Sequence, residues 1–215
     1  MLHTQPDGFH RSREPIQIGA ELYGEAGAEA DLEILGLMLQ GLAVCGVKTL
    51  QLDIGHVGVY RALAQEARLS REVEHQLFGA LQAKDSSAVA VLAAGLPIAL
   101  RDAFAALPRL YGDRSVLAEA RACLPQLAAV EAALDTLEIL DRGLVNVEAA
   151  YDLAELRGYG YHSGVVFAAY TGGRSHAIAQ GGRYDEVGRV FGRARPATGF
   201  SLDLRELVIA GSDAQ

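Results

Sequence analysis

The sequence predicts an α+β fold in which an antiparallel sheet is flanked by helices and interrupted by a helical insertion. Short segments with alternating apolar and polar residues occur near both ends of the chain, as expected of half-buried strands. Between them, residues 70–142 carry apolar side chains at helical spacing. The chain has neither strand–helix alternation nor the glycine pattern of a Rossmann or P-loop fold, which argues against a doubly wound parallel sheet.

Length and charge limit the classes of function. The 215 residues, half of them hydrophobic, suffice for one substantial core or two small ones. No apolar run is long enough to span a membrane, and the first residues lack the pattern of a signal peptide, so we expect a soluble, cytoplasmic protein without a membrane partner. The net charge of −8 argues against general binding of nucleic acid.

Neither a metal nor a cofactor is expected. Cys45 and Cys123 lie far apart and form no CxxC pair, so they indicate neither a disulfide framework nor a zinc site. The six histidines are scattered and show no metal-ligand spacing.

The first predicted domain covers residues 1–67. Residues 16–23 alternate, with Ile16, Ile18, Ala20 and Leu22 on a face that we expect in a core. The other face carries Gln17, Gly19 and Glu21, which is typical of a ligand platform. A helix over 29–45, a strand over 47–54, a turn over 55–58 and a helix to about 67 are predicted to follow.

The second predicted domain, residues 68–144, is a helical insertion. Ser70 can cap one helix, Ser86 and Ser87 open another, and Pro125 is suited to the first position of a helix that reaches Leu140. This segment carries no catalytic constellation, so we assign it a structural role.

The third predicted domain, residues 145–215, returns to strands over 145–153, 159–170, 176–180 and 198–204, with a short helix at the end. A turn over 171–173 makes the middle two strands a hairpin. Arginines crowd the Gly-rich part of this domain, which indicates either a solvated loop or an attraction for an anion; they are Arg174, Arg183, Arg189, Arg193 and Arg195.

The polar faces of these strands predict a binding site. An open face lined by Gln17, Glu21, Arg157 and Tyr161 suits a small zwitterion, because a carboxylate binds an ammonium group and an arginine binds a carboxylate. The stretch 180–185 supplies further glycines and a tyrosine close by. The alternative is an ordinary Gly/Tyr-rich strand and hairpin.

A hydrolytic site is not indicated. His162 and Ser163 are adjacent, so a strand would point them to opposite faces, and no GxSxG motif occurs. We therefore predict binding without chemistry and no catalytic residue.

Four motifs occur in order, at 17–21 (Gln-x-Gly-x-Glu), 156–164, 181–185 (Gly-Gly-Arg-Tyr-Asp) and 198–202. Together they resemble the core of histidyl-tRNA synthetases, which are class II synthetases built on an antiparallel sheet. Residues 13–24 and 161–170 are more similar still to non-catalytic relatives, the regulatory subunits of ATP phosphoribosyltransferase. The resemblance covers essentially the whole chain and implies a partial class II synthetase core that lacks its N-terminal part.

The resemblance also implies a site for L-histidine. The positions that match the family's histidine site are Gln17, Glu21, Arg157, Tyr161, His162 and Gly182. Gly160 departs from the pattern, because the synthetases usually carry an aspartate there.

Two further departures concern ATP. Leu2 replaces the arginine and Thr4 the glutamate of the second synthetase motif, and Glu206 stands where the third motif has an arginine. Loss of two phosphate-binding cations removes the electrostatic basis of adenylation. The resemblance thus implies a non-catalytic regulatory subunit, with the short-form catalytic subunit of ATP phosphoribosyltransferase as partner and L-histidine as feedback effector.

Two other functions remain open from the sequence. One is a fragment of a catalytic histidyl-tRNA synthetase, and the other is a stand-alone histidine-binding sensor.

Overall fold

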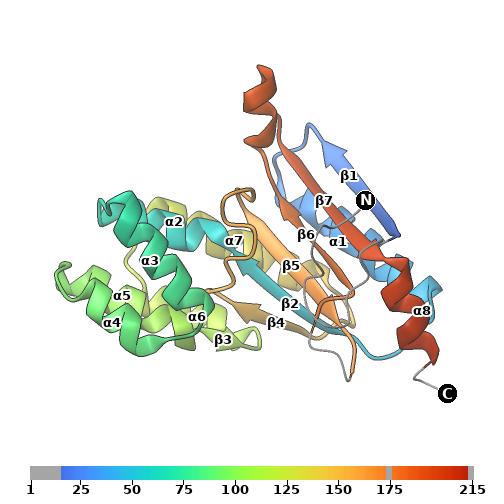
Figure 1. Cartoon of the computed structure of the whole chain (residues 1–215), viewed down its shortest axis with the longest axis horizontal. Helices are drawn as coiled ribbons and strands as arrows, with labels where there is room; N and C mark the ends of the chain where they lie inside the picture. Colours follow the sequence, from blue (N-terminus) through green and yellow to red (C-terminus); the bar gives the residue numbers. More distant parts are fainter. Residues whose placement is uncertain (1–15, 173–175, 213–215) are drawn as a thin grey trace.

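A computed structural model describes residues 16–172 and 176–212. Its centre is a seven-stranded sheet with the order β1-β7-β6-β5-β2-β4-β3 (Figure 1). The strands are β1 (Gln17–Tyr23), β2 (Gln51–His56), β3 (Tyr111–Gly112), β4 (Ala149–Asp152), β5 (Val165–Tyr170), β6 (Ala179–Arg183) and β7 (Ala197–Asp203). The helices are α1 (Ala28–Val44), α2 (Val57–Glu66), α3 (Arg71–Gln82), α4 (Ser86–Ala93), α5 (Ile98–Ala106), α6 (Ser115–Cys123), α7 (Ala128–Gly143) and α8 (Leu204–Ser212), with 3₁₀ turns η1 (Leu107–Arg109) and η2 (Val187–Phe191).

The α+β class with a sheet flanked by helices is confirmed, with one difference in strand direction. β2 and β4 are parallel, whereas the other neighbouring pairs are antiparallel, so the sheet is mixed. Parallel neighbours need a long crossover. Here the chain leaves β2, runs through α2 to α7 and returns beside β2 as β4.

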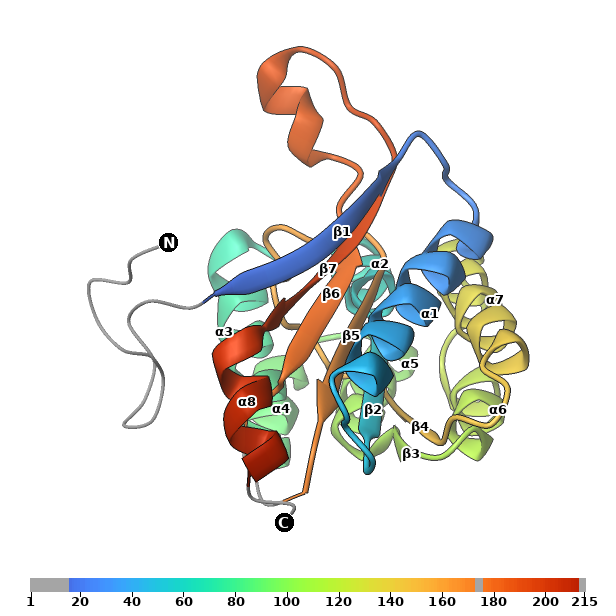
Figure 2. The ribbon, with the colours of Figure 1, turned by 90° about the vertical axis from the view of Figure 1, so that its right-hand side faces the viewer.

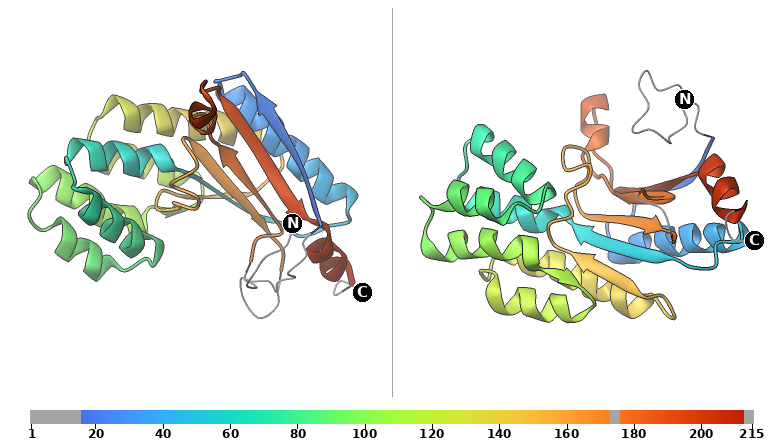
Figure 3. Two further views of the ribbon diagram at one scale, coloured as in Figure 1. Left: turned by 45° about the horizontal axis from the view of Figure 1, so that its top comes forward. Right: turned by 60° about the horizontal axis from the view of Figure 1, so that its bottom comes forward.

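Helices α1 and α7 cover one face of the sheet (Figure 2). The core lies between them and the strands, and includes the fully buried Leu35, Met38, Leu52 and Ile54. Helices α3 to α6 lie beyond one side of the sheet (Figure 3). Among the described residues, no helix is both long and apolar enough to cross a bilayer.

The opposite face of the sheet carries small and polar residues. The register pairs Glu21 with Gly199 and Gly199 with Gly182, and directly paired residues point to the same side. The polar face of β1 therefore continues across β7 and β6. This open face is where the sequence predicts a ligand.

The burial of β1 differs from the prediction. Ala20 and Leu22 pack against the core, but Ile16 and Ile18 are each 50% exposed. Among the described residues β1 pairs only with β7, so it is an edge strand with a neighbour on one side. A core face on an edge strand is only partly covered.

Several predicted boundaries are wrong. β2 begins at Gln51 and continues through His56 directly into α2, with no intervening turn. The His56 side chain makes this possible, because Nδ1 accepts a hydrogen bond from Gly58 N at 3.1 Å and caps the helix. α7 begins at Ala128 and not at Pro125, and the short strand β3 was not predicted. The cap at Ser70 is confirmed, since its Oγ accepts from Val73 N at 3.3 Å.

Candidate functional site

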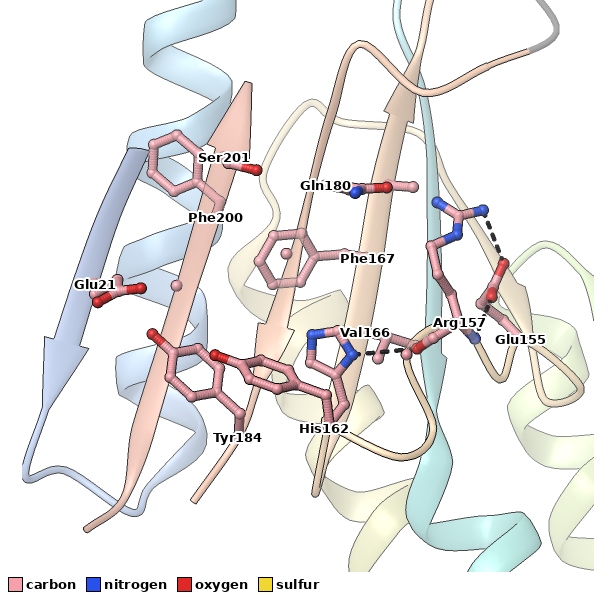
Figure 4. A pocket seen from close by; sticks show the side chains of 15 residues that line it. Glu21, Glu155, Arg157, His162, Val166, Phe167, Gln180, Tyr184, Phe200 and Ser201 are labelled. Atoms are coloured by element: carbon pink, nitrogen blue, oxygen red, sulfur yellow. Dashed lines mark hydrogen bonds and ion pairs between the residues drawn. The ribbon is translucent and has the colours of Figure 1, made fainter. Parts of the chain in front are cut away.

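A cavity of about 280 Å³ lies on the open face, above β5, β6 and β7 (Figure 4). Its volume is near the lower end of the roughly 300–1,000 Å³ that is usual for small-molecule sites. The lining residues are Glu21, Glu155, Arg157, Gly158, Tyr161, His162, Val166, Phe167, Ala168, Gln180, Gly181, Tyr184, Gly199, Phe200 and Ser201.

Glycines keep the floor of the cavity low. A Cβ at Gly199 would lie 2.9 Å from Glu21 Cγ and 3.1 Å from the Tyr184 hydroxyl, and one at Gly181 would lie 2.6 Å from the Phe167 ring. All three distances are shorter than ordinary Cβ contacts, so a side chain at either position would displace its neighbours.

The loop of residues 157–164 forms one wall, where the sequence predicted the start of a strand. β5 begins only at Val165. Gly158 has a φ of +63°, and its carbonyl accepts hydrogen bonds from the backbone N–H groups of Tyr161 and His162 at 2.7 Å each. The positive φ is accessible to glycine at no steric cost and closes a turn. Tyr161 and His162 therefore both reach the cavity, although they are adjacent in sequence.

The His162 ring packs between two glycines. A Cβ at Gly158 or at Gly182 would collide with the ring, and at Gly182 the distance to Cδ2 would be 2.8 Å. Nδ1 lies 3.1 Å from the Arg157 carbonyl oxygen, which can only accept, so Nδ1 carries a proton and donates it. Burial lowers the pKa of His162, which favours a neutral ring with Nε2 as an acceptor.

Arg157 forms the cationic end of the cavity. Its Nη2 donates to Tyr170 Oη at 2.6 Å and lies 3.2 Å from Glu155 Oε2. Burial acts to lower the pKa of Arg157, but the Tyr170 hydrogen bond and the charges of Glu155 and Asp53 raise it overall. The guanidinium stays charged and is held in place by the phenol and the carboxylate.

Glu21 forms the anionic end, on the far side of the cavity from Arg157 (Figure 4). Tyr23 Oη donates to Glu21 Oε2. Tyr184 stacks obliquely on Tyr161, with ring centroids 4.9 Å apart. The Tyr184 hydroxyl is buried beside Glu21 and Tyr23, and burial above all, together with hydrogen bonding to these two side chains, raises its pKa. A buried phenol of this kind can take a polar group of a ligand as its partner.

The structure brings together four of the six predicted site residues. Glu21, Arg157, Tyr161 and His162 line the cavity. Gln17 is exposed at the start of β1, outside the lining, and Gly182 lies against the His162 ring. The sequence did not single out Glu155, Gln180 or Tyr184 as site residues. Gln180 and Tyr184 could have been found inside the stretch 180–185, whereas Glu155 carried no signal beyond its closeness to Arg157.

The arginine of that stretch has a structural role. Arg183 is 6% exposed, and its Nε donates to Asp31 Oδ2 at 2.9 Å. Its other nitrogens donate to Asp185 Oδ1 and to the carbonyls of Glu25 and Gly27. Its charge is thereby neutralised within the fold. Of the other clustered arginines, Arg189 pairs with Glu186 on the surface, and Arg174 lies outside the described residues.

Of the positions at which this chain departs from the ATP-binding motifs of the synthetases, the structure describes Glu206. Glu206 is buried in α8, and its Oε2 lies 2.8 Å from His176 Nε2. It does not line the cavity. Leu2 and Thr4 lie outside the described residues. Within the described ranges, no group of three His, Cys, Asp or Glu side chains could hold a metal ion.

Comparison with known proteins gives consistent similarities. A family model described as histidyl-tRNA synthetase matches residues 1–207. The ATP phosphoribosyltransferase regulatory subunit of Thiobacillus denitrificans is 80% identical over 215 residues, which are 100% of this chain and 67% of that protein. This chain spans about half of the length, 54%, of two other curated relatives with the same name.

Solved structures of other proteins share the fold of this chain. The crystal structure of an ATP phosphoribosyltransferase regulatory subunit/histidyl-tRNA synthetase from Bacillus halodurans matches with a TM-score of 0.80 and 30% identity, over 90% of this chain and 52% of that one. A chain of the ATP phosphoribosyl transferase (HisG:HisZ) complex from Thermotoga maritima matches with a TM-score of 0.67 over 88% of this chain and 66% of its own. Its 19% identity shows a shared fold alone.

Proposed function

Because this chain belongs to the histidyl-tRNA synthetase family and, within it, to the regulatory subunits of ATP phosphoribosyltransferase, we propose that it is a non-catalytic regulatory subunit. It binds the short-form catalytic subunit, activates it and carries feedback inhibition by L-histidine. The observation that carries the proposal is the 80% identity, over the whole chain, to a relative that bears this name.

The cavity supports L-histidine as the ligand. It holds a carboxylate at one end and a charged guanidinium at the other, which match the ammonium and carboxylate groups of an amino acid. Between these ends lie phenol, imidazole and amide groups, from Tyr184, His162 and Gln180, which can bond an imidazole. We propose that Gln17 and Gly182 belong to the site by resemblance, Gln17 at its margin and Gly182 as the support of His162.

Glu206 is the reason why we do not propose aminoacylation for this chain. A synthetase places an arginine there, whereas this chain buries a carboxylate against His176. A negative charge at that position would repel a triphosphate. If this chain catalysed a histidine-dependent exchange of pyrophosphate into ATP, that result would favour a fragment of a synthetase instead.

Titration calorimetry with three probes tests the ligand assignment. L-Histidine should bind, whereas histidinol, which keeps the ammonium and imidazole groups but lacks the carboxylate, should bind at least about tenfold more weakly. Arg157→Met should abolish this preference, and Arg101→Met, an exposed arginine on α5, should preserve it. No binding of L-histidine, or an unchanged preference in Arg157→Met, would overturn the assignment.

Partner binding needs its own test. Co-expression with a short-form catalytic subunit should give a complex that survives size exclusion, and the Thiobacillus denitrificans relative serves as the matched control. A complex that forms with the relative and not with this chain would contradict the proposed partner.

A further inference from the structure

The loop of residues 157–164 has an unusual anchor. It supplies Arg157, Tyr161 and His162 to the cavity, yet it lies outside regular secondary structure except for the turn at Gly158. Backbone hydrogen bonds fix its C-terminal end, from Ser163 N to the Arg183 carbonyl at 2.7 Å and from Val57 N to the Gly164 carbonyl at 3.0 Å. Among the described residues, the backbone bonds of residues 157–162 reach only Leu156 and Gly158. Its geometry must therefore depend on contacts from other elements.

One guanidinium makes three of these contacts. Arg61, on α2, donates from Nη2 to the Tyr159 carbonyl at 3.2 Å and to the His162 carbonyl at 3.0 Å. Its Nη1 donates to the Ser163 carbonyl at 3.4 Å. The guanidinium carbon also lies 5.0 Å from the centre of the Tyr159 ring, in cation–π geometry.

Tyr159 extends the anchor to α3. Its hydroxyl donates to Glu74 Oε1 at 2.7 Å, and its ring packs on Tyr60 and Phe78 with centroids 5.2 Å and 5.5 Å apart. The Tyr60 hydroxyl in turn donates to the Glu74 carbonyl at 2.6 Å. The loop is thus bonded on its outer side to two successive helices, while its inner side carries the cavity groups.

We propose that Arg61 is a positioning residue for the ligand site: its bonds to three loop carbonyls, together with the Tyr159–Glu74 bond, hold Arg157, Tyr161 and His162 in the geometry that binds the ligand. Arg61 does not line the cavity, so it acts only through the loop. A planar guanidinium is suited to holding the loop, because its N–H groups diverge in a fixed fork that reaches several carbonyls at once. Lysine offers a single ammonium point and cannot reproduce this arrangement.

The same contacts link the helical segment to the site. A displacement of α3 would pull on Tyr159 through Glu74, and a ligand that orders the loop would in turn favour one position of α3. Such coupling is reciprocal. The identity of the ligand as L-histidine rests on the proposed function, but the role of Arg61 in fixing the loop does not.

Hydrogen exchange and calorimetry together test the inference. The backbone N–H groups of Tyr161 and His162, which bond to Gly158, should exchange faster in ligand-free Arg61→Met than in the wild type. L-Histidine should bind this variant about tenfold or more weakly. Arg61→Lys and Glu74→Gln should show smaller changes in both readouts. Arg101→Met, which removes an exposed arginine paired with its neighbour Asp102, should show neither change.

The two proposals fail in distinguishable ways. If the wild type does not bind L-histidine, the proposed ligand is wrong, while the exchange rates still decide the role of Arg61. If Arg61→Met unfolds, Glu74→Gln and Arg61→Lys supply the comparison. Unchanged exchange of the loop amides in a folded Arg61→Met variant, or L-histidine affinity equal to that of the wild type, would overturn the inference.

Discussion

Arg183 and Asp31 form a buried ion pair that joins β6 to α1, with Arg183 Nε 2.9 Å from Asp31 Oδ2 and side-chain exposures of 8% and 2%. Arg183 belongs to the Gly-Gly-Arg-Tyr-Asp stretch that lies beside the ligand cavity. Its side chain nevertheless points to the helix-covered face, where Asp31 and two loop carbonyls take its N–H groups. The pair therefore holds β6, which forms part of the cavity floor, in a fixed position against α1.

Removal of Arg183 should therefore destabilise the protein strongly. Arg183→Met leaves Asp31 buried without its partner, and breaking a buried pair in this way costs about 3–5 kcal/mol. Urea denaturation gives the free energy of unfolding. Arg189→Met, which removes an exposed arginine paired with Glu186, is the control and should change it by no more than about 0.5 kcal/mol. Equal effects of the two substitutions would refute a structural role for the buried pair.

Gly182 and Gly160 offer a second matched pair of variants. A Cβ at Gly182 would lie 2.5 Å from the Val165 carbonyl oxygen and 2.8 Å from His162 Cδ2, whereas one at Gly160 would meet nothing within 4 Å. Gly182→Ala should move the His162 ring, weaken L-histidine binding about tenfold or more and destabilise the fold by about 1–3 kcal/mol. Gly160→Ala should leave both quantities near their wild-type values. The reverse order of effects, measured by calorimetry and urea denaturation, would contradict the site geometry.

The half-buried His56 predicts a loss of stability in mild acid. Burial above all, with the charges of Arg61 and Arg183, lowers the pKa of His56 from 6.5 to about 4. Between these values the unfolded chain binds a proton that the folded chain does not, so stability falls as the pH falls. From pH 7 to about pH 4.5 this group should remove on the order of 2 kcal/mol.

Asparagine at position 56 isolates this contribution. His56→Asn can still cap α2 through its side-chain oxygen but cannot take up a proton. The free energy of unfolding of the variant should therefore decrease less between pH 7 and pH 4.5 than that of the wild type. Parallel decreases in the two proteins would show that His56 does not carry the effect.

Glu21 and Gln17 share one face of β1 but differ in their distance from the ligand cavity. Glu21 lines it, whereas Gln17 lies outside the lining. Glu21→Gln removes the negative end of the cavity and should weaken L-histidine binding about tenfold or more, because a charge-assisted bond to the ammonium group is lost. Gln17→Ala should weaken L-histidine binding clearly less than Glu21→Gln does. Calorimetry in which Gln17→Ala is the more damaging of the two would move the site toward the open end of β1.

Much of the fold could be predicted from local patterns. Helix α1 and strands β1 and β7 follow from periodicities that the structure preserves, and the open face follows from polar residues at alternate positions of β1. The parallel pairing of β2 with β4 could not be predicted in this way, because it is set by the path of the chain through six helices.

The loop of residues 157–164 shows why part of the site escaped prediction. Its alternating tyrosines match the period of a strand, yet Gly158 takes a positive φ and the carbonyls bond to Arg61, nearly a hundred residues away. Once the segment turns, Glu155 and Tyr184 join the cavity with Tyr161. These neighbours depend on tertiary contacts that no local pattern contains.

The central claim, that this chain regulates ATP phosphoribosyltransferase, is tested most directly by the initial rate of phosphoribosyl-ATP formation. The short-form catalytic subunit is assayed alone, with this chain, and with this chain plus L-histidine, and the Thiobacillus denitrificans relative runs in parallel as positive control. We predict that this chain raises the rate and that L-histidine then lowers it. A rate unchanged by this chain, under conditions in which the relative activates, would contradict the account.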